Sequence, residues 1–395
     1  MTAHPLSTLI CSAIARQGGW LPFDRYMALA LYAPGLGYYA RGDRQFGTSP
    51  ASGSDFITAP ELSPLFGQAL ARQVVQALEG SGTDEVWEFG AGSGVLAREL
   101  LGTLGDRVRR YTIVEVSGAL RERQREVLRP HLDRVRWVDA LPEAMQGVVV
   151  GNEVLDAMPV QLLHFDGAHW HERGVALSEP AFADTSHGAA ERPAASAGAP
   201  GHAATAPAWA WADHRTALRP PAEELVEALA GSGTTYITEI HAQAEAFIAT
   251  LAERLQRGAA FFIDYGFPAA EYYHPQRSGG TLMCHRAHQA DADPLADVGC
   301  KDITAHVNFT GIALAAQAAG LEVLGYTSQA HFLMNCGLLE LLQGAGIRTV
   351  AHAQKLLTEH EMGELFKVIG FAKQCDAAFT TAPIGFARGD RTHTL

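Results

Sequence analysis

The stretch VWEFGAGSGVLARELL, residues 86–101, decides the expected fold. An apolar run comes first, Gly90, Gly92 and Gly94 follow, and an amphipathic run comes last. This order is typical of a buried strand, a tight loop and a helix. Alternating glycines let another group approach the backbone closely, because no side chain stands in the way. Taken alone, such a pattern is often only an ordinary tight turn.

The overall composition excludes several classes of protein. The chain has 395 residues, of which 47% are hydrophobic, and a formal net charge of −13 at pH 7. This acidic balance argues against nucleic acid as a partner, because phosphate binding needs a basic face. No apolar run reaches the about 18 residues that a membrane span needs. The N-terminal MTAHPLSTLICSAIARQGGW indicates an amphipathic helix rather than a signal peptide, so we expect a cytoplasmic protein.

The cysteines give no sign of a disulfide frame or of a metal site. Five of them are scattered along the chain without any C-x-x-C spacing, which is typical of reduced thiols. The cluster of Cys284, His285 and His288 could suggest zinc. Ligands on adjacent residues point in different directions, however, and no second pair lies at zinc spacing. We therefore expect no metal.

Strand-like and helical segments alternate through the middle of the chain. Strands are expected at 84–90, 110–116, 135–140, from 147 onward and at 259–266. Helices are expected over 95–101, 117–128 and 244–258, the last of them ended by Gly258. Strands that are apolar throughout, with helices between them, predict an α/β fold with a doubly wound, mostly parallel sheet covered on both faces.

The ends of these strands carry acidic or amide side chains. Right-handed crossovers bring the carboxyl ends of parallel strands to one edge of the sheet, where ligands bind. The polar residues at these ends are Glu88, Glu115, Asp139, Asn152, Glu153 and Asp264. A buried carboxylate is costly unless it meets a hydrogen-bond donor. A ligand with hydroxyls, an amino group and a positive charge supplies such donors.

The glycine spacing distinguishes between classes of nucleotide. A dinucleotide loop follows G-x-G-x-x-G, whereas here the third glycine comes one position early and Glu88 precedes the first. Glu115 lies about 20 residues past Gly94, where an acid that binds a ribose is expected. Asp139 is placed to reach an adenine amino group. The pattern favours S-adenosylmethionine, and a nicotinamide-dependent oxidoreductase is the alternative from another enzyme class.

The chain resembles the MidA-like family of class I S-adenosylmethionine-dependent methyltransferases from about residue 20 almost to its end. The segments that carry the resemblance are FDRYMALALYAPGLGYYA (23–40), SDFITAPELSPLFG (54–67), EFGAGSG (88–94), NEVLDAMPV (152–160), IDYG (263–266), GGTLMCHRAH (279–288), DITAHVNFT (302–310) and MGELFKVIGFA (362–372). TAPE and NEVLDAMPV are more specific than the glycine motif. Asn308 departs from the aspartate expected in many relatives.

The resemblance implies both an architecture and an activity. The sheet would be seven-stranded and Rossmann-like. Residues 1–82 would form a helical cap that covers the cofactor, 83–266 the methyltransferase core with an inserted hairpin, and 267–395 a substrate-side insertion and the end of the core sheet. The low-complexity segment 182–207 predicts a mobile loop between two strands of that hairpin. Eukaryotic members of the family are mitochondrial and methylate an arginine on a core subunit of respiratory complex I.

Cofactor contacts are expected from the glycine loop, from the strand ends and, by the resemblance, from the TAPE segment. The candidates are Thr58, Pro60, Glu61, Glu88, Gly90, Gly92, Ser93, Gly94, Glu115, Ser117, Asp139, Ala140, Asn152 and Glu153. A proline in a first turn followed by a glutamate suits a helix N-terminus. TAPE could therefore be only the start of a helix.

Glu153 and Asp156 are the main catalytic candidates. A guanidinium is a poor nucleophile, because its charge is delocalised and its proton is held above about pH 12. Two carboxylates can hold it, orient one nitrogen and accept the proton. Three positions apart on a first helical turn, the two acids would share a face. Asp156 could instead cap the next helix.

His306 is a further candidate for the substrate pocket, although a lone histidine is often only a structural hydrogen-bond partner. Tyr26, Tyr32, Tyr38 and Tyr39 are expected in the cap, either over the site or as cap core.

The leading hypothesis is a protein arginine methyltransferase that acts on a subunit of complex I. Another protein or small-molecule acceptor and a non-catalytic assembly factor are the alternatives, and the oligomeric state stays open.

Overall fold

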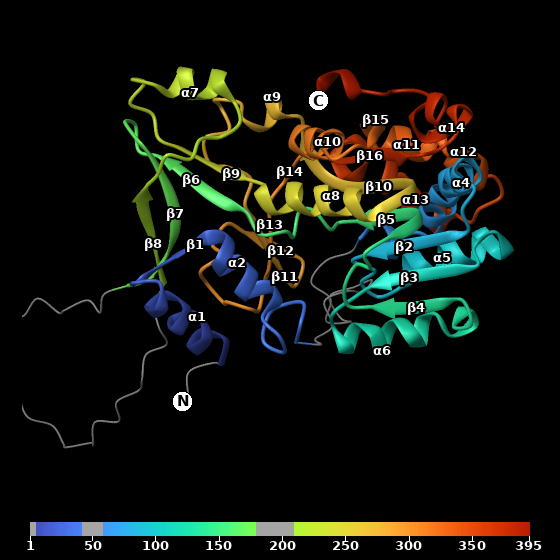
Figure 1. Cartoon of the computed structure of the whole chain (residues 1–395), viewed down its shortest axis with the longest axis horizontal. Coiled ribbons are helices and arrows are strands. Elements are labelled where there is room, and N and C mark those ends of the chain that lie inside the picture. The colour runs from blue at the N-terminus through green and yellow to red at the C-terminus, as the bar shows by residue number, and fades with distance from the viewer. Residues whose placement is uncertain (1–4, 42–57, 179–208) are drawn as a thin grey trace, which may run out of the picture.

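The computed structural model describes residues 5–41, 58–178 and 209–395 (Figure 1). The predicted mobile loop at 182–207 lies outside the described residues. The N-terminal segment forms the expected amphipathic helix, α1 (Pro5–Arg16), which buries Leu6, Ile10 and Ile14. None of the helices in the described ranges combines the length and the apolar character that crossing a bilayer requires.

A large central sheet contains most of the strands predicted from the sequence. Seven of its strands lie in the order β15 (Glu322–Ser328), β16 (Phe366–Lys373), β10 (Leu255–Phe267), β5 (Met145–Asn152), β2 (Glu85–Phe89), β3 (Arg110–Val114) and β4 (Val135–Val138). The short β14 (Val307–Asn308) pairs with the end of β10. The five strands from β10 to β4 are parallel and β16 runs antiparallel to β10. The predicted mostly parallel sheet is confirmed.

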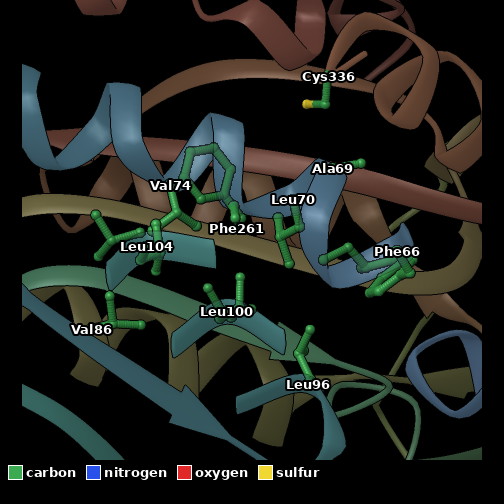
Figure 2. Close-up of a cluster of buried hydrophobic side chains, with 14 of the residues drawn as sticks. Phe66, Ala69, Leu70, Val74, Val86, Leu96, Leu100, Leu104, Phe261 and Cys336 are labelled. Atoms are coloured by element: carbon green, nitrogen blue, oxygen red, sulfur yellow. The ribbon is translucent and has the colours of Figure 1, made fainter. Parts of the chain in front are cut away.

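Helices cover both faces of this sheet, as the doubly wound prediction requires. One face packs against α4 (Pro64–Ser81), α5 (Val95–Leu104), α11 (Gln329–Asn335) and α13 (Ile347–Leu357), and the other against α8 (Ala242–Arg254) and α10 (Phe309–Ala318). Figure 2 shows Leu70 and Val74 of α4 directed toward Leu100 and Leu104 of α5. This spacing of three or four residues places one apolar stripe of each helix in the core.

The boundary between α8 and β10 differs from the prediction. The helix expected to end at Gly258 ends at Arg254, and β10 begins at once with Leu255. Gly258 has φ +142° and is paired with Gly147 of β5. A Cβ added at Gly258 would lie 1.8 Å from the carbonyl oxygen of Gly147, so this glycine permits close strand pairing. The sequence did not show that Gly258 allows β5 to lie close to β10.

A second, antiparallel sheet lies beside the central one. Its strands are β1 (Trp20–Pro22), β7 (Trp170–Leu177), β6 (Gln161–Phe165), β9 (Tyr236–Ile240) and β8 (Trp209–Arg215). The expected hairpin is present, because β7 and β8 pair from Leu177 opposite Trp209. Helix α2 (Phe23–Tyr32) packs with α1 against this sheet through a shared apolar cluster.

The remaining elements are short. A three-stranded sheet consists of β12 (Gln289–Asp291), β11 (Met283–Arg286) and β13 (Asp302–Thr304). The other helices are α3 (Ala59–Leu62), α6 (Gly118–Val127), α7 (Glu223–Leu229), α9 (Ala269–Tyr272), α12 (Leu338–Leu341), α14 (Ala377–Thr381), η2 (Gly105–Arg107), η3 (Arg129–His131), η4 (Glu359–Gly363), η5 (Ile384–Phe386) and η6 (Thr392–Thr394). In Figure 1 the arrowheads of β3 and β4 point toward the side where α2 and the small sheet lie.

Candidate active site

A cavity of about 1510 Å³ lies at the carboxyl ends of the central strands. Its lining from the central sheet includes Gly90, Glu115, Asn152 and Tyr265, which follow or end β2, β3, β5 and β10. Other parts of the wall come from α2, α6, α8, the small sheet β11–β13 and the segment from the end of α13 to η4. The cavity therefore lies at the edge of the sheet where the sequence predicted a ligand-binding site.

The glycine loop between β2 and α5 exposes bare backbone to the cavity. Gly90, Gly92 and Gly94 all have positive φ, at 63°, 50° and 87°. A Cβ added at Gly90 would lie 2.8 Å from Cγ2 of Val154. Gly90 and Gly92 line the large cavity, and Gly94 precedes the first turn of α5. The loop thus depends on glycine both for its conformation and for space.

The TAPE segment forms the short helix α3 against this loop. Thr58 is its N-terminal flanking residue and Pro60 lies in its first turn, so the helix-start interpretation is correct. The segment also contacts the glycine loop, because Ser93 donates a hydrogen bond to the Glu61 carboxylate. A second cavity of about 30 Å³ behind the loop is lined by Pro60, Glu61 and Ser93 among others.

Glu88 lies in this small cavity rather than in the large one. Its carboxylate accepts a hydrogen bond of 2.7 Å from the Tyr111 hydroxyl. Burial raises the pKa of Glu88 to about 7, against the opposing effect of that hydrogen bond. Gly90 and Asn152 line both cavities, whereas Glu115 is among the residues of the large one and Glu88 among those of the small one.

Glu115 directly follows β3 and lines the large cavity. Its carboxylate accepts hydrogen bonds from the Ser117 N–H at 2.8 Å and from the Gln124 side-chain amide at 3.2 Å. Ser117 also caps α6 by accepting the Leu120 N–H. Burial raises the pKa of Glu115, and the backbone N–H of Ser117 opposes this rise.

Asp139 and Ala140 lie elsewhere. Both are exposed, and neither is among the residues that line the cavity. Their contact with a cofactor therefore stays a prediction.

The residues after β5 form a turn, so the expectation of a helical first turn is wrong. Residues 153–160 contain no helix, and the chain proceeds to β6. Asp156 therefore does not cap a helix. Glu153 has φ +54°, and this left-handed residue reverses the chain. Glu153 and Asp156 both line the cavity because of this turn.

Burial weakens the acidity of both carboxyl groups. The pKa of Glu153 is raised to about 8, by burial and then by the charge of Asp156. Burial raises the pKa of Asp156 to about 6, although the Tyr265 hydroxyl donates a hydrogen bond to Oδ2. Asn152 donates to Glu153 at 2.9 Å.

Two buried acceptors line the cavity without a hydrogen-bond partner in the described part of the chain. They are Oδ1 of Asp156 and Oδ1 of Asn152, on side chains whose residues are 4% and 8% exposed. Buried acceptors of this kind normally have donors. These two atoms therefore suit a ligand that donates hydrogen bonds.

His306 lies in the cavity wall with its ring stacked on Phe267, at a centroid distance of 5.2 Å and an angle of 9°. Tyr265 meets the ring edge-on at 5.1 Å. The backbone N–H of His306 donates to Oγ1 of Thr281 at 3.1 Å. Burial lowers the pKa of His306 to about 4, so the ring is neutral at pH 7. Its catalytic role stays a prediction.

Part of the lining was not apparent from the sequence. Tyr32 and Tyr39, for which the sequence left a site role and a core role open, both line the cavity, whereas Tyr26 and Tyr38 are buried in the core of the N-terminal segment. Asp302 also lines the cavity and had no distinguishing spacing.

Asn308 is the N-cap residue of α10. Its side chain caps α10 by accepting the Gly311 N–H at 3.3 Å, a role that an aspartate would also fill. Across residues 5–41, 58–178 and 209–395, no group of three or more His, Cys, Asp or Glu side chains is arranged to hold a metal ion.

The family model described as "Putative S-adenosyl-L-methionine-dependent methyltransferase" matches residues 69–327. The chain belongs to this methyltransferase family. It is therefore an enzyme whose cofactor is S-adenosylmethionine, and the family and cofactor predictions are confirmed. The residues present fit that cofactor: bare backbone at Gly90, a carboxylate at Glu115 for ribose hydroxyls, and the open acceptor of Asn152 for an ammonium group.

Two solved structures from Burkholderia thailandensis share the whole fold. One, bound to S-adenosyl-homocysteine, is 48% identical, with a TM-score of 0.86, and the match covers 99% of this chain and 96% of the other. A native structure is 46% identical, with a TM-score of 0.81 and the same coverage. These neighbours confirm the methyltransferase architecture of the sheet.

Curated relatives carry a more specific name. The "Protein arginine methyltransferase NDUFAF7 homolog, mitochondrial" of Drosophila melanogaster is 27% identical over 347 residues, which cover 80% of this chain and 71% of the fly protein. The NDUFAF7 protein of Danio rerio is 26% identical over 392 residues, covering 88% of this chain and 82% of its own length.

Proposed function

We propose that this methyltransferase transfers its methyl group to an arginine side chain of a protein, and that the protein is a subunit of respiratory complex I. The observation that carries the proposal is the pair Glu153 and Asp156, which line the same cavity as the glycine loop. The name of the fly and fish relatives supports an arginine as the acceptor.

The charge of the cavity favours a cationic acceptor. Carboxylates in its lining come from Glu115, Glu153, Asp156, Asp302 and Glu361. Lys355 is the single Lys or Arg among the described lining residues. A cavity lined mainly by one sign of charge attracts the opposite sign. A guanidinium also supplies five N–H donors in one plane, which suit paired carboxylate oxygens.

Within this proposal the side chains divide the work of the reaction. S-adenosylmethionine supplies, when bound, an electrophilic methyl group on a sulfonium sulfur. The glycine loop and Glu115 orient the nucleoside at one end of the cavity. Glu153 and Asp156 hold the guanidinium and direct one nitrogen toward the methyl group. The Tyr265 hydroxyl fixes Asp156 by donating to its Oδ2.

Proton transfer follows from the pKa values of the two acids. A guanidinium releases its proton above about pH 12 in water, and methylation requires that proton to leave. The pKa of Glu153, raised to about 8, makes this carboxylate a stronger base than an exposed glutamate. Binding of the cation first favours the ionised forms of both acids, because opposite charge offsets their burial.

The cysteines support a reducing compartment for this reaction. All five are free thiols in the structure. Such unpaired cysteines are typical of cytosolic proteins, so we place the enzyme in the cytoplasm, although the curated relatives are named as mitochondrial.

Mass spectrometry of complex I tests the acceptor directly. We expect intact-mass and peptide spectra of its subunits to lose a methyl mark on one arginine when this gene is deleted. Identical spectra with and without the gene would contradict the proposal.

Substitution of the acids separates an enzyme from an assembly factor that acts without catalysis. Glu153→Gln and Asp156→Asn should each abolish the arginine mark while S-adenosyl-homocysteine still binds, as measured by calorimetry. Glu126→Gln, at an exposed position of α6, is the matched control and should keep the mark. A mark that survives both substitutions would exclude the assigned role of the two acids.

A further inference from the structure

One buried carboxylate lies at the centre of the turn that carries Glu153 and Asp156. It belongs to Asp264 near the end of β10, which is 1% exposed. Its Oδ2 accepts three backbone N–H groups in succession, from Val154 at 3.1 Å, Leu155 at 2.8 Å and Asp156 at 3.3 Å. The whole turn is therefore folded around a single oxygen atom.

The backbone on either side of this oxygen is also fixed. The Glu153 N–H donates to the carbonyl of Ile263 at 2.9 Å, and the Ala305 N–H donates to the carbonyl of Asp156 at 3.0 Å. The left-handed conformation of Glu153 turns the following N–H groups inward, which creates a backbone concavity for an anion. These amides have no helix or sheet partner, so the carboxylate of Asp264 satisfies them.

We infer that Asp264 is a positioning residue for methyl transfer: its carboxylate holds the 153–156 turn in the shape that presents Glu153 and Asp156 to the cavity. This inference rests on the proposed role of those two acids. It does not require the acceptor to be an arginine, because any acceptor that they bind would depend on the same turn.

The charged groups around Asp264 add an electrostatic consequence. Burial raises its pKa, and the charges of Asp156 and Glu153 raise it further, while the backbone donors oppose this. On the other side, Lys367 of β16 is the Cα partner of Asp264, but its ammonium group bonds Glu364 instead. The Tyr265 hydroxyl points to Asp156. The charges of Asp156 and Glu153 thus disfavour ionisation of Asp264.

Hydrogen exchange tests the positioning without any acceptor. In Asp264→Ala the amides of residues 154–156 should exchange at least tenfold faster than in the wild type, because their shared acceptor is gone. Asp264→Asn should keep exchange at 154–156 within tenfold of the wild type, since its carbonyl oxygen can accept the same three bonds, although its amide loses the bond of 3.1 Å that Oδ1 accepts from the Tyr265 N–H. Asp166→Asn is the matched control: Asp166 accepts the N–H groups of Ala168 and His169 in a surface turn away from the cavity.

Methyl transfer tests the consequence for the reaction. The readout is labelled methyl incorporation from S-adenosylmethionine into the total protein of cells that lack this gene. We expect Asp264→Ala to lower the initial rate at least a hundredfold. Asp264→Asn should lower it by less than tenfold, because its carbonyl oxygen can still accept the N–H bonds of the turn. The affinity for S-adenosyl-homocysteine should stay within threefold for Asp264→Asn.

Several outcomes would overturn the inference. Native exchange at 154–156 in Asp264→Ala would do so, and so would a wild-type rate in that variant. If Asp264→Ala does not fold, Asp264→Asn decides: a rate lowered a hundredfold while exchange at 154–156 stays within tenfold of the wild type would show that Asp264 does not act by holding the turn. Absence of labelling by the wild-type enzyme would instead refute the protein acceptor, and the exchange data would still decide the role of Asp264.

Discussion

The hydroxyl of Tyr39 donates a hydrogen bond of 2.8 Å to Oδ1 of Asp302, a residue 263 positions later in the chain. Tyr32, stacked on Tyr39 at 5.5 Å, donates in the same way to the carbonyl of Ala157 at 2.8 Å. These two bonds attach the N-terminal cap to the small sheet and to the turn of Asp156. The cap is therefore part of the cavity wall and not only a cover.

Tyr39→Phe should raise the KM for the protein acceptor about three- to tenfold, with a smaller effect on kcat. The change removes a hydrogen bond to a carboxylate, a type of bond worth about 1.5–3 kcal/mol. Steady-state kinetics with varied acceptor measures the effect. Tyr236→Phe is the control, because its hydroxyl bonds the His274 carbonyl away from the cavity. An unchanged KM in Tyr39→Phe would show that the cap bond does not shape the acceptor site.

The dependence of kcat/KM on pH should follow the two raised acids. The pKa is about 8 for Glu153 and about 6 for Asp156, and both must be ionised to hold a cation. The value of kcat/KM should therefore rise about tenfold per pH unit between pH 6 and 8 and then level off. In Glu153→Gln the plateau should begin near pH 6 to 7, at a lower rate. A wild-type profile that is flat from pH 6 to 8 is incompatible with this assignment.

Glu153→Gln should also change how stability depends on pH. The pKa of Glu153 is raised from 4.5 to about 8 on folding, so between these values the native protein keeps a proton that the unfolded chain releases. The wild type therefore loses stability as pH rises from 4.5 to 8, whereas a glutamine cannot ionise. We expect equal Tm values at pH 4.5 and a Tm about 1–3 °C higher for the variant at pH 8.5. Thermal unfolding followed by circular dichroism measures this difference, and a lower Tm for the variant at pH 8.5 would refute it.

Gly90→Ala should weaken binding of S-adenosyl-homocysteine at least tenfold, as measured by calorimetry. The added Cβ would lie 2.8 Å from Val154, at a position with φ +63° that L residues rarely adopt. Gly102→Ala is the control within the same strand–loop–helix unit. Gly102 lies in α5 with nothing within 4 Å of an added Cβ, so alanine should stabilise the protein by up to about 1 kcal/mol. Equal affinities in both variants would remove the glycine loop from the cofactor site.

The sequence by itself determined the fold and the edge of the sheet where ligands bind. Apolar runs such as VWEF and GVVV, alternating with helical segments, favoured buried strands, and the stripe of Leu96 and Leu100 favoured a helix that covers them. The glycine loop and Glu115 also followed from the sequence, because their spacing reflects local backbone geometry along neighbouring segments. Local periodicity and turn chemistry depend on residues close in the chain, and these can be read without knowing the tertiary structure.

Only the tertiary structure decided how the individual side chains meet. The local sequence at 153–156 suggested a helix that does not form. The turn found there is held by Asp264, which lies more than a hundred positions away and could not be related to it from the sequence. The end of α8 depends on the pairing of Gly258 with Gly147. The position of the Asp302 side chain depends on its hydrogen bond from the Tyr39 hydroxyl. Asp139 directly follows β4, one position beyond the strand in which it was expected, and is exposed to solvent. Such contacts join segments that are distant in the chain, and packing energies between distant segments leave no pattern in the local sequence.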